Sequence, residues 1–550
     1  MSLLLLLLLA CSKDEVVAAD DSRPDIVRES SAWNDSDEPA DDSAEPATDV
    51  ELRMSPARAT IGVGGVLDLR VVVLDSAGEL RDVVPELQVD QASVLTLGAG
   101  SVQGSAAGTA TVTASFEGLT GSAEITVQAE DVLTLTLVDA STGQALDDTR
   151  VAVDGVRYLA EAGSLTVPLS SSGPVTFTAY HVSTDYIPAT VYGAVVRDVT
   201  LPLRLATDED PPSSVLGGSL DFSACDEAEW DELLVGFSGS SIQAHPLLLD
   251  AEDLVGEARV VDFYGADVSV PGNISLGGLD ESWSSLGAPG PVGAWTFAGP
   301  VPISELSAGI DTVTQAVGLL QDRSERIRHA WIGGLVAGSS AVIQDLAPAQ
   351  RLDDSVLVTV PDLPFGFAGT EEVLLVALSE QPEGHAVMGL GAGLGSVELP
   401  YAALEDGQLL AYAEVGGVGT GGGRSLQLVP LDPDAVRLGE FLQAPALSSF
   451  DGSSGAFELT NDEQAQLVRV HVLSFDGGKR DLWLSGGAVA EELTRDGPSM
   501  GFGRTIWRVT ALDLVEGTLQ GRLSSGELDP VALEGSLRRT ALLQEQRTGG

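Results

Sequence analysis

From residue 51 onward, the chain consists largely of short runs in which apolar and polar residues alternate. Successive side chains of a β-strand point to opposite faces, so such a run has one apolar and one polar face. Glycine and proline, with 63 and 27 residues of 550, separate these runs into strand-sized pieces. The sequence therefore predicts a mainly β chain of tandem antiparallel β-sandwiches. Clear examples of the alternation are residues 67–73, 133–137, 175–179, 356–360 and 468–472.

The chain is strongly acidic, with 82 Asp and Glu against 28 Lys and Arg and a net charge of −54. Its 44% of hydrophobic residues is enough for folded cores, and its length predicts several domains. Nucleic-acid binding relies on basic residues that displace counterions, so this composition excludes nucleic acid as a partner. Electrostatic docking on anionic lipid is disfavoured for the same reason. The acidity predicts a well-solvated surface and permits diffuse cation binding, but no cofactor and no specific metal site is predicted.

The N-terminus contains seven consecutive leucines, Leu3 to Leu9, followed by Ala10 and Cys11. This run is too short to span a bilayer and is typical of the apolar core of a secretory signal. Residues 8–11 resemble the lipobox of bacterial lipoproteins. The resemblance implies a signal peptide over 1–10, cleavage between Ala10 and Cys11, and lipidation of Cys11. Only Met1 and Ser2 precede the leucines, without the usual positive charge, so the true start codon is expected upstream.

Residues 11–50 combine the lipidated cysteine with many Asp and Glu residues among Ser, Ala and Pro. Such a segment cannot offset its ordering entropy, so we expect a disordered acidic tether that holds the folded part away from the membrane. An acidic ligand-binding tail is the alternative. Ser12 follows the lipidated cysteine, and by resemblance to Gram-negative lipoproteins this favours the outer membrane. The remaining cysteine, Cys225, is then a lone thiol, expected to act as a small buried apolar side chain.

Residues 51–128 carry motifs that resemble the bacterial immunoglobulin-like domain of group 2. Val89 departs from the pattern, because it stands where this family often has a core tryptophan. The resemblance implies a β-sandwich that acts as a spacer or adhesion module of surface proteins, with no catalytic residues. The matching residues are 55–56, 62–64, Asp75 with Gly78, 100–104, 107–114 and 123–127.

Residues 131–205 form a second unit of alternating strands, which resembles the carboxypeptidase regulatory-like domain, a small transthyretin-like sandwich. The matching residues are 139–143, 151–153 and 186–188. This resemblance implies an accessory domain without peptidase chemistry. The Pro- and Asp-rich residues 206–215 are expected to be a linker. Asp208 and Asp210 could help to ligate calcium there, but no complete calcium loop follows them.

Residues 216–550 resemble no family that we can name. Strand patterns dominate, and we expect two or three β subdomains with boundaries near 300 and 445. One amphipathic helix is predicted over 304–331, with Ser304 as its N-cap. Its apolar stripe should pack on a sheet. The stripe consists of Leu306, Ile310, Val313, Val317 and Leu320, continued by Ile327 and Trp331.

Several strings in this region match catalytic or binding motifs without their required context. Ser499 lies in a nucleophile-elbow string, but no helix and no histidine follow it. Residues 417–422 match a dinucleotide glycine pattern outside any β-α-β unit. His329 follows Glu325 by four residues on the predicted helix, where an ion-pair face with the nearby arginines is favoured over a metal site. Four tryptophans could stack on sugars or lie in cores: Trp230, Trp283, Trp295 and Trp331.

Two functional hypotheses remain. The favoured one is a lipid-anchored extracytoplasmic protein of the cell envelope with a binding, adhesion or structural role, in contact with surface proteins or polysaccharide. It has no catalytic residues. The alternative is a lipid-tethered hydrolase that acts on envelope or extracellular polymers, with its site in 216–550. The sequence identifies neither the ligand nor the residues that bind it.

Overall fold

The computed structural model confirms the mainly β fold, with many sheets and few, short helices. The predicted signal peptide, Cys11 and the acidic tether up to residue 49 lie outside the described residues. The same holds for residues 417–422 and for Ser499. The structure describes residues 50–74, 80–153, 155–209, 214–243, 245–248, 259–263, 266–270, 273–287, 289–306, 313–338, 342–364, 367, 372–402, 408–416, 423–493, 504–515, 517–533 and 536–548.

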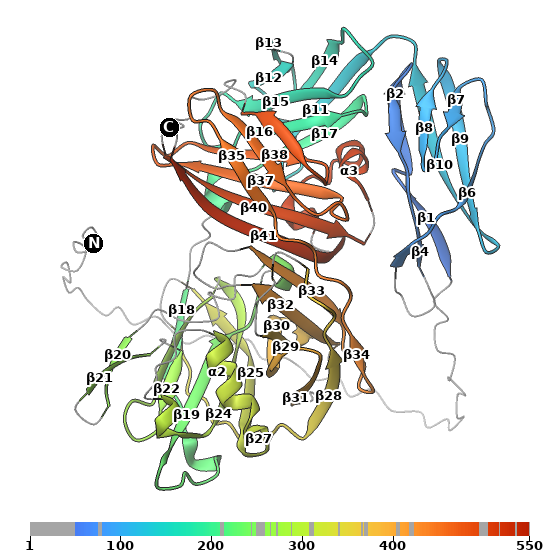
Figure 1. Cartoon of the computed structure of the whole chain (residues 1–550). Helices are drawn as coiled ribbons and strands as arrows, with labels where there is room; N and C mark the ends of the chain where they lie inside the picture. Colours follow the sequence, from blue (N-terminus) through green and yellow to red (C-terminus); the bar gives the residue numbers. More distant parts are fainter. Residues whose placement is uncertain are drawn as a thin grey trace, which may run out of the picture. The chain divides into compact units, whose positions relative to one another are not determined.

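The first ten strands form the segment that resembles an immunoglobulin-like domain, shown in blue in Figure 1. They pair as β1-β4-β5, β2-β10-β9-β6 and β3-β8-β7, with β2 parallel to β10. Leu67, Leu69, Val71 and Val73 are all buried, as their alternation predicts. The strands are β1 (Glu51–Ser55), β2 (Arg58–Gly62), β3 (Val66–Asp68), β4 (Arg70–Leu74), β5 (Leu80–Asp82), β6 (Glu86–Val89), β7 (Leu95–Leu97), β8 (Ser101–Gly104), β9 (Gly108–Phe116) and β10 (Leu119–Gln128).

The next seven strands form two sheets that enclose a common core. One sheet has the order β14-β11-β17, and the other begins β13-β12-β15-β16. Leu133, Leu135 and Leu137 on β11 are fully buried, again on the predicted face. The strands are β11 (Val132–Asp139), β12 (Thr149–Val153), β13 (Val156–Leu159), β14 (Ser164–Pro168), β15 (Val175–His181), β16 (Ala189–Ala194) and β17 (Asp198–Leu203).

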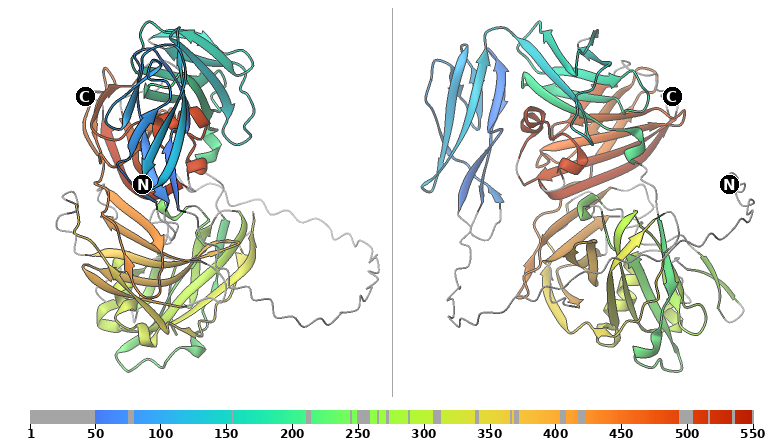
Figure 2. Two further views of the ribbon diagram at one scale, coloured as in Figure 1. Left: turned by 90° about the vertical axis from the view of Figure 1, so that its right-hand side faces the viewer. Right: turned by 180° about the vertical axis from the view of Figure 1, so that it is seen from behind.

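Strand β16 continues into the C-terminal part of the chain, because it pairs in parallel with β38. The sheet that results has fifteen strands and runs on through β38-β37-β40-β41-β33-β32-β29-β30-β31-β28-β34. Figures 1 and 2 show β40 and β41 side by side as long red strands. The additional strands are β28 (Asp354–Thr359), β29 (Val373–Gln381), β30 (Gly384–Gly393), β31 (Ser396–Tyr401), β32 (Leu409–Gly416), β33 (Arg424–Pro430), β34 (Val436–Arg437), β37 (Leu467–Ser474), β38 (Lys479–Leu484), β40 (Arg504–Leu514) and β41 (Leu537–Thr548).

A smaller sheet, β35-β36-β39, lies against the C-terminal strands, and the middle of the chain forms three further sheets. Their orders are β23-β18-β26, β22-β19-β24-β25-β27 and β20-β21. The strands are β18 (Ser214–Ser219), β19 (Glu232–Ser240), β20 (Arg259–Phe263), β21 (Ala266–Val270), β22 (Ile274–Leu276), β23 (Ser282–Gly287), β24 (Gly290–Pro302), β25 (Arg328–Ala337), β26 (Val342–Ile343), β27 (Gln350–Arg351), β35 (Ala446–Phe450), β36 (Ala456–Thr460) and β39 (Val489–Glu492).

The long helix predicted over 304–331 is wrong in its extent. The structure has α1 (Ile303–Leu306) and α2 (Val313–Gln321), then a 3-10 turn, η5 (Ser324–Arg326). Ser304 lies inside α1 and is not its N-cap, and Trp331 lies on β25. The β-branched and aromatic residues after Arg328 pair with β24, which overrides the apparent helical spacing. Leu306, Val317 and Leu320 are buried, so this part of the stripe does face the core.

Other short helical segments complete the chain. Of the two subdomain boundaries expected in 216–550, residue 300 lies within β24, and residue 445 lies between β34 and β35. The expected linker 206–215 is partly a 3-10 turn, and β18 starts at Ser214. The segments are α3 (Leu519–Ser525), α4 (Pro530–Leu533), η1 (Ala206–Glu209), η2 (Phe222–Ala224) and η3 (Pro246–Leu248).

Candidate functional site

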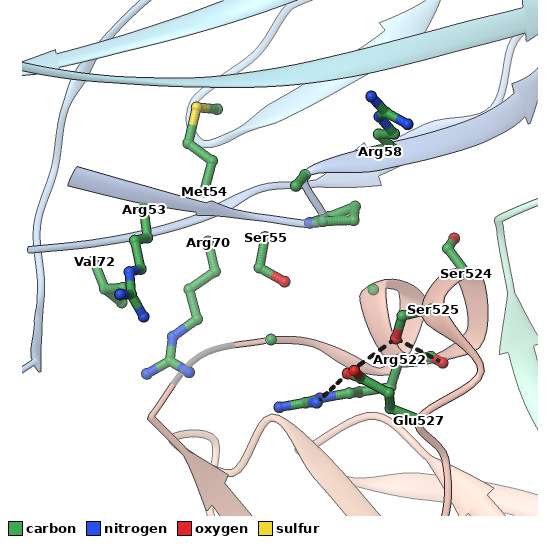
Figure 3. Close-up of a pocket in the computed structure, with 14 residues that line it drawn as sticks. Arg53, Met54, Ser55, Arg58, Arg70, Val72, Arg522, Ser524, Ser525 and Glu527 are labelled. Atoms are coloured by element: carbon green, nitrogen blue, oxygen red, sulfur yellow. Dashed lines mark hydrogen bonds and ion pairs between the residues drawn. The ribbon is translucent and has the colours of Figure 1, made fainter. Parts of the chain in front are cut away.

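A cavity of about 460 Å³ lies where the first strands meet the C-terminal helix α3. One wall comes from β1, the turn after it and the start of β2, with two side chains from β4. The other wall comes from residues 517–527, which include α3 (Figure 3). The cavity has the size of an ordinary small-molecule site. Its lining is distinctive in so acidic a chain, because four of the 14 lining residues are arginines: Arg53, Arg58, Arg70 and Arg522.

Two glycines shape the wall that contains α3, and one of them, Gly521, lies directly against the first strands. A Cβ atom on Gly521 would lie 2.8 Å from the hydroxyl of Ser55. Gly517 has a φ of +103°, and a Cβ there would lie 2.9 Å from Nε of Arg522. A side chain at Gly521 would therefore push the two walls apart, whereas one at Gly517 would strain the backbone and clash with Arg522 of the same wall. Thr518 caps α3, because its hydroxyl accepts a hydrogen bond from the backbone N–H of Gly521.

Arg70 ties the two walls together. Its Nε and Nη2 atoms donate to the two carboxylate oxygens of Asp82, at 2.8 and 3.2 Å, and Nη1 donates to the carbonyl of Leu514 at 2.6 Å. The buried carboxylate of Asp513 lies 3.9 Å from Nη2. Burial would raise the pKa of Asp82, but the hydrogen bond and charge of Arg70 outweigh it, so this pKa lies below its usual value.

The other three arginines also have carboxylate neighbours. Nη1 of Arg522 donates to Glu527 at 2.5 Å, and Nη2 donates to Ser536 Oγ at 2.6 Å. Figure 3 shows the Arg522–Glu527 contact and a second bond from Ser525 to the same carboxylate. Arg53 pairs with Glu51, and the exposed Arg58 lies 3.9 Å from Glu124. The acids compensate the guanidinium charges while leaving a surface of N–H and O–H donors.

This arrangement suits the binding of a polar or anionic group and not acid–base chemistry. Ser55, Ser524 and Ser525 add hydroxyl groups to the lining. The one carboxylate among the described lining residues, Glu527, is engaged by Arg522 and Ser525. None of these lining residues is a histidine or a cysteine that could activate a nucleophile.

Arg70 gives a direct test of how the walls are held. We expect Arg70→Ala to lower the free energy of unfolding by about 1–3 kcal/mol, because it removes charged hydrogen bonds and leaves the buried Asp513 less compensated. Amide hydrogen exchange should rise in β4 and in residues 514–527. The matched control is Arg81→Ala, since Arg81 is 62% exposed in its side chain and lies 4.0 Å from Glu117. Equal exchange in both variants would contradict this role of Arg70.

The residues singled out in the sequence lie elsewhere. The expectation that His329 shares a helix face with Glu325 is wrong, since His329 lies on β25 and is fully buried. Its Nε2 lies 3.1 Å from the carbonyl of Val387, and burial lowers the pKa of His329 to about 4. Among the described residues, no group of three or more His, Cys, Asp or Glu side chains could hold a metal ion.

The four tryptophans differ in environment. Trp283 and Trp295 are buried, and Trp331 is half-buried, so these three are core or interface residues. Trp230 is 91% exposed. Cys225 is a free, half-buried thiol that packs beside the buried Leu216–Trp283 cluster. Burial raises the pKa of Cys225 to about 11, which makes it a poor nucleophile.

The cavity was missed in the sequence because its walls lie more than 440 residues apart along the chain. Because arginine is scarce in this acidic chain, each arginine could be noted as a candidate binding residue. The spacing of residues along the sequence does not indicate that Arg53 or Arg70 lies near Arg522. They are brought together by the packing of α3 against β2 and by the hydrogen bond from Arg70 to the carbonyl of Leu514.

No protein-family model matches this chain, and no curated protein matches it. Solved structures with local likeness include the Bacillus anthracis TIE protein, at 8% identity and a TM-score of 0.13, covering 72% of this chain and 75% of that one. Two B repeat units of the Staphylococcus aureus collagen binding protein match at 8% identity and a TM-score of 0.16, covering 80% and 100%. A tandem repeat of a large adhesion protein matches at 13% identity and a TM-score of 0.11, covering 84% and 95%. Likeness at these TM-scores carries no functional argument.

Within the described parts of the chain, none of the helices has the length and apolar character that crossing a bilayer requires.

Proposed function

We propose that this protein is a lipid-anchored component of the bacterial cell envelope with a binding, adhesion or structural role. Cys11 is the anchor, the acidic residues that follow it are the tether, and the β-sheets from residue 50 onward form the functional part. The outer membrane is the proposed location. Surface proteins or polysaccharide are the proposed partners.

The observation that carries a binding role is the composition of the arginine-lined cavity. Its guanidinium and hydroxyl groups offer hydrogen-bond donors, and guanidinium groups recognise carboxylates and phosphates in particular. A chain with a net charge of −54 repels anions over most of its surface, so a locally compensated, donor-rich cavity is where an anionic group would bind.

A sedimentation assay with polysaccharide isolated from the cell envelope tests the binding role against the hydrolase alternative. We expect the full chain to sediment with the polymer, and the polymer to keep its length and its number of reducing ends. Gly521→Leu tests whether the cavity binds the polymer, because the leucine side chain would enter the space between the cavity walls. Release of shorter polymer chains by the wild type would instead support a hydrolase.

A further inference from the structure

Trp230 is an aromatic side chain that the fold leaves almost fully exposed. It lies in the loop between η2 and β19, and its side chain is 91% exposed. Among the described residues, the other aromatic residue with a large exposed side chain is Phe475, at 55%. Tryptophan is the residue most typical of energetically dominant positions at protein interfaces. An exposed tryptophan is therefore a candidate contact residue for a partner.

The backbone on both sides of Trp230 is fixed by hydrogen bonds. The N–H of Glu232 donates to the carbonyl of Glu229 at 3.1 Å, and the N–H of Glu229 donates to Glu232 Oε2 at 2.9 Å. Arg326 donates to both carboxylate oxygens of Glu232, at 2.8 and 2.9 Å, and to the carbonyl of Glu227 at 3.0 Å. A fixed turn displays the indole without the entropic cost of ordering a loop on binding.

Three exposed acids surround the indole in sequence: Glu227, Glu229 and Asp231. Their carboxylates make no hydrogen bond or ion pair with the described residues, in contrast to Glu232, which Arg326 engages. Arg326 interacts with the charge of Glu229, but its guanidinium is already bonded to both oxygens of Glu232, so this turn presents a net negative charge next to an aromatic face.

The other exposed aromatic residue shows what such a face accepts in this protein. The guanidinium of Arg504 lies 4.4 Å from the ring centroid of Phe475. A cation over an aromatic ring is attracted by the negative charge on the ring face, and tryptophan is the strongest acceptor. Within the described residues, no arginine or lysine covers the ring of Trp230.

We propose that Trp230, with Glu227, Glu229 and Asp231, is a docking site for a basic segment of a partner protein. An arginine or lysine side chain of the partner stacks on the indole, and neighbouring basic residues pair with the three carboxylates. This site is separate from the arginine-lined cavity, and its charge is opposite. A neutral sugar could stack on the indole alone, but it would form no ion pair with the three carboxylates.

The test measures binding of a fluorescent, end-capped peptide of alternating glycine and arginine to the full chain at about 0.15 M salt, where exposed charges are screened beyond about 8 Å. We expect Trp230→Ala to weaken binding about tenfold, and Trp230→Phe, which keeps an aromatic face, to restore most of it. The matched control is Phe475→Ala, whose ring is already covered by Arg504, and its affinity should equal that of the wild type. An unchanged melting temperature would show that Trp230→Ala folds normally.

Two results would overturn the proposal. Equal affinity of the wild type and Trp230→Ala would show that the peptide binds only through general attraction to the acidic surface. Binding of a neutral oligosaccharide that depends on Trp230, without Trp230-dependent binding of the peptide, would assign the site to sugars.

Discussion

Replacement of Asp481 by asparagine is expected to lower the free energy of unfolding by about 3–5 kcal/mol, because it removes one partner from a buried ionic cluster. Asp481 lies on β38 and is 3% exposed. Its Oδ1 accepts hydrogen bonds from Arg469 at 2.9 and 3.1 Å and lies 2.9 Å from Nδ1 of His471. Arg204 lies 3.8 Å from Oδ2. Asparagine fills the same space but removes the buried negative charge that faces both arginines, although Arg204 keeps a second acid, Asp529, at 3.6 Å.

The cluster also lies at the parallel pairing of β16 with β38. The backbone N–H of Asp481 donates to the carbonyl of Pro188, and Asp481 is paired in register with Ala189. Arg204 comes from the end of the β11–β17 segment, so the ion pair joins two segments far apart in sequence. We therefore expect the loss of stability to be accompanied by faster amide exchange in β16.

The pH dependence follows from the direction of the pKa shift. Burial alone would raise the pKa of Asp481, but Arg469, His471 and Arg204 outweigh it and hold this pKa far below the usual 3.8. A carboxyl group with a depressed folded-state pKa contributes stability above its unfolded pKa and loses it as the pH falls toward the folded pKa. The difference between wild type and Asp481→Asn should be full at pH 7 and shrink below about pH 4.

Urea unfolding at pH 7 and at pH 3 measures both effects. The control is Asp68→Asn, which removes the same unit of charge from an exposed side chain on β3. It should change stability by less than about 0.5 kcal/mol, because surface substitutions of this kind usually do. A loss for Asp68→Asn as large as that for Asp481→Asn would mean that net charge, and not the buried cluster, determines stability.

Local features of the fold could be predicted from the sequence. The alternation at residues 133–137 matches the buried face of β11, and residues 139–143, part of the matched pattern, form a turn. Asp139 and Tyr186 fall in two separate pieces of one matched pattern, and the structure joins them, because the Tyr186 hydroxyl donates to Asp139 at 2.7 Å. Such features depend on a few neighbouring residues and on turn chemistry.

Features that depend on distant segments could not be predicted. All residues of β29 from Val373 to Ser379 are buried, because its two faces pack into different cores. Such a strand shows no alternation, so its place at the centre of a large sheet leaves no periodic signal. The cavity and the pairing of β16 with β38 could not be predicted because each joins segments that lie far apart in the sequence. The apparent helical stripe at Ile327 and Trp331 was misleading because spacing alone does not exclude a strand.

Replacement of Cys11 by serine is expected to move the protein from the detergent phase to the aqueous phase in a two-phase separation. Two or three acyl chains, at about 0.8 kcal/mol per buried methylene, give lasting membrane attachment. The matched control is Cys225→Ser, which removes the other cysteine, a half-buried thiol. This control should stay in the detergent phase with the wild type.

Mass spectrometry must accompany the partition assay, because serine at position 11 is also expected to block cleavage after Ala10. The uncleaved variant would keep the seven leucines, Leu3 to Leu9. That run is far shorter than the roughly 20 apolar residues that span a bilayer, so it should attach the chain less firmly than the acyl chains do. A wild-type mass that includes acyl chains on Cys11, together with loss of detergent partition in Cys11→Ser alone, is the expected combination. Equal partition of wild type, Cys11→Ser and Cys225→Ser, with no acyl mass on any of them, would remove the lipid anchor and with it the proposed place of this protein in the cell envelope.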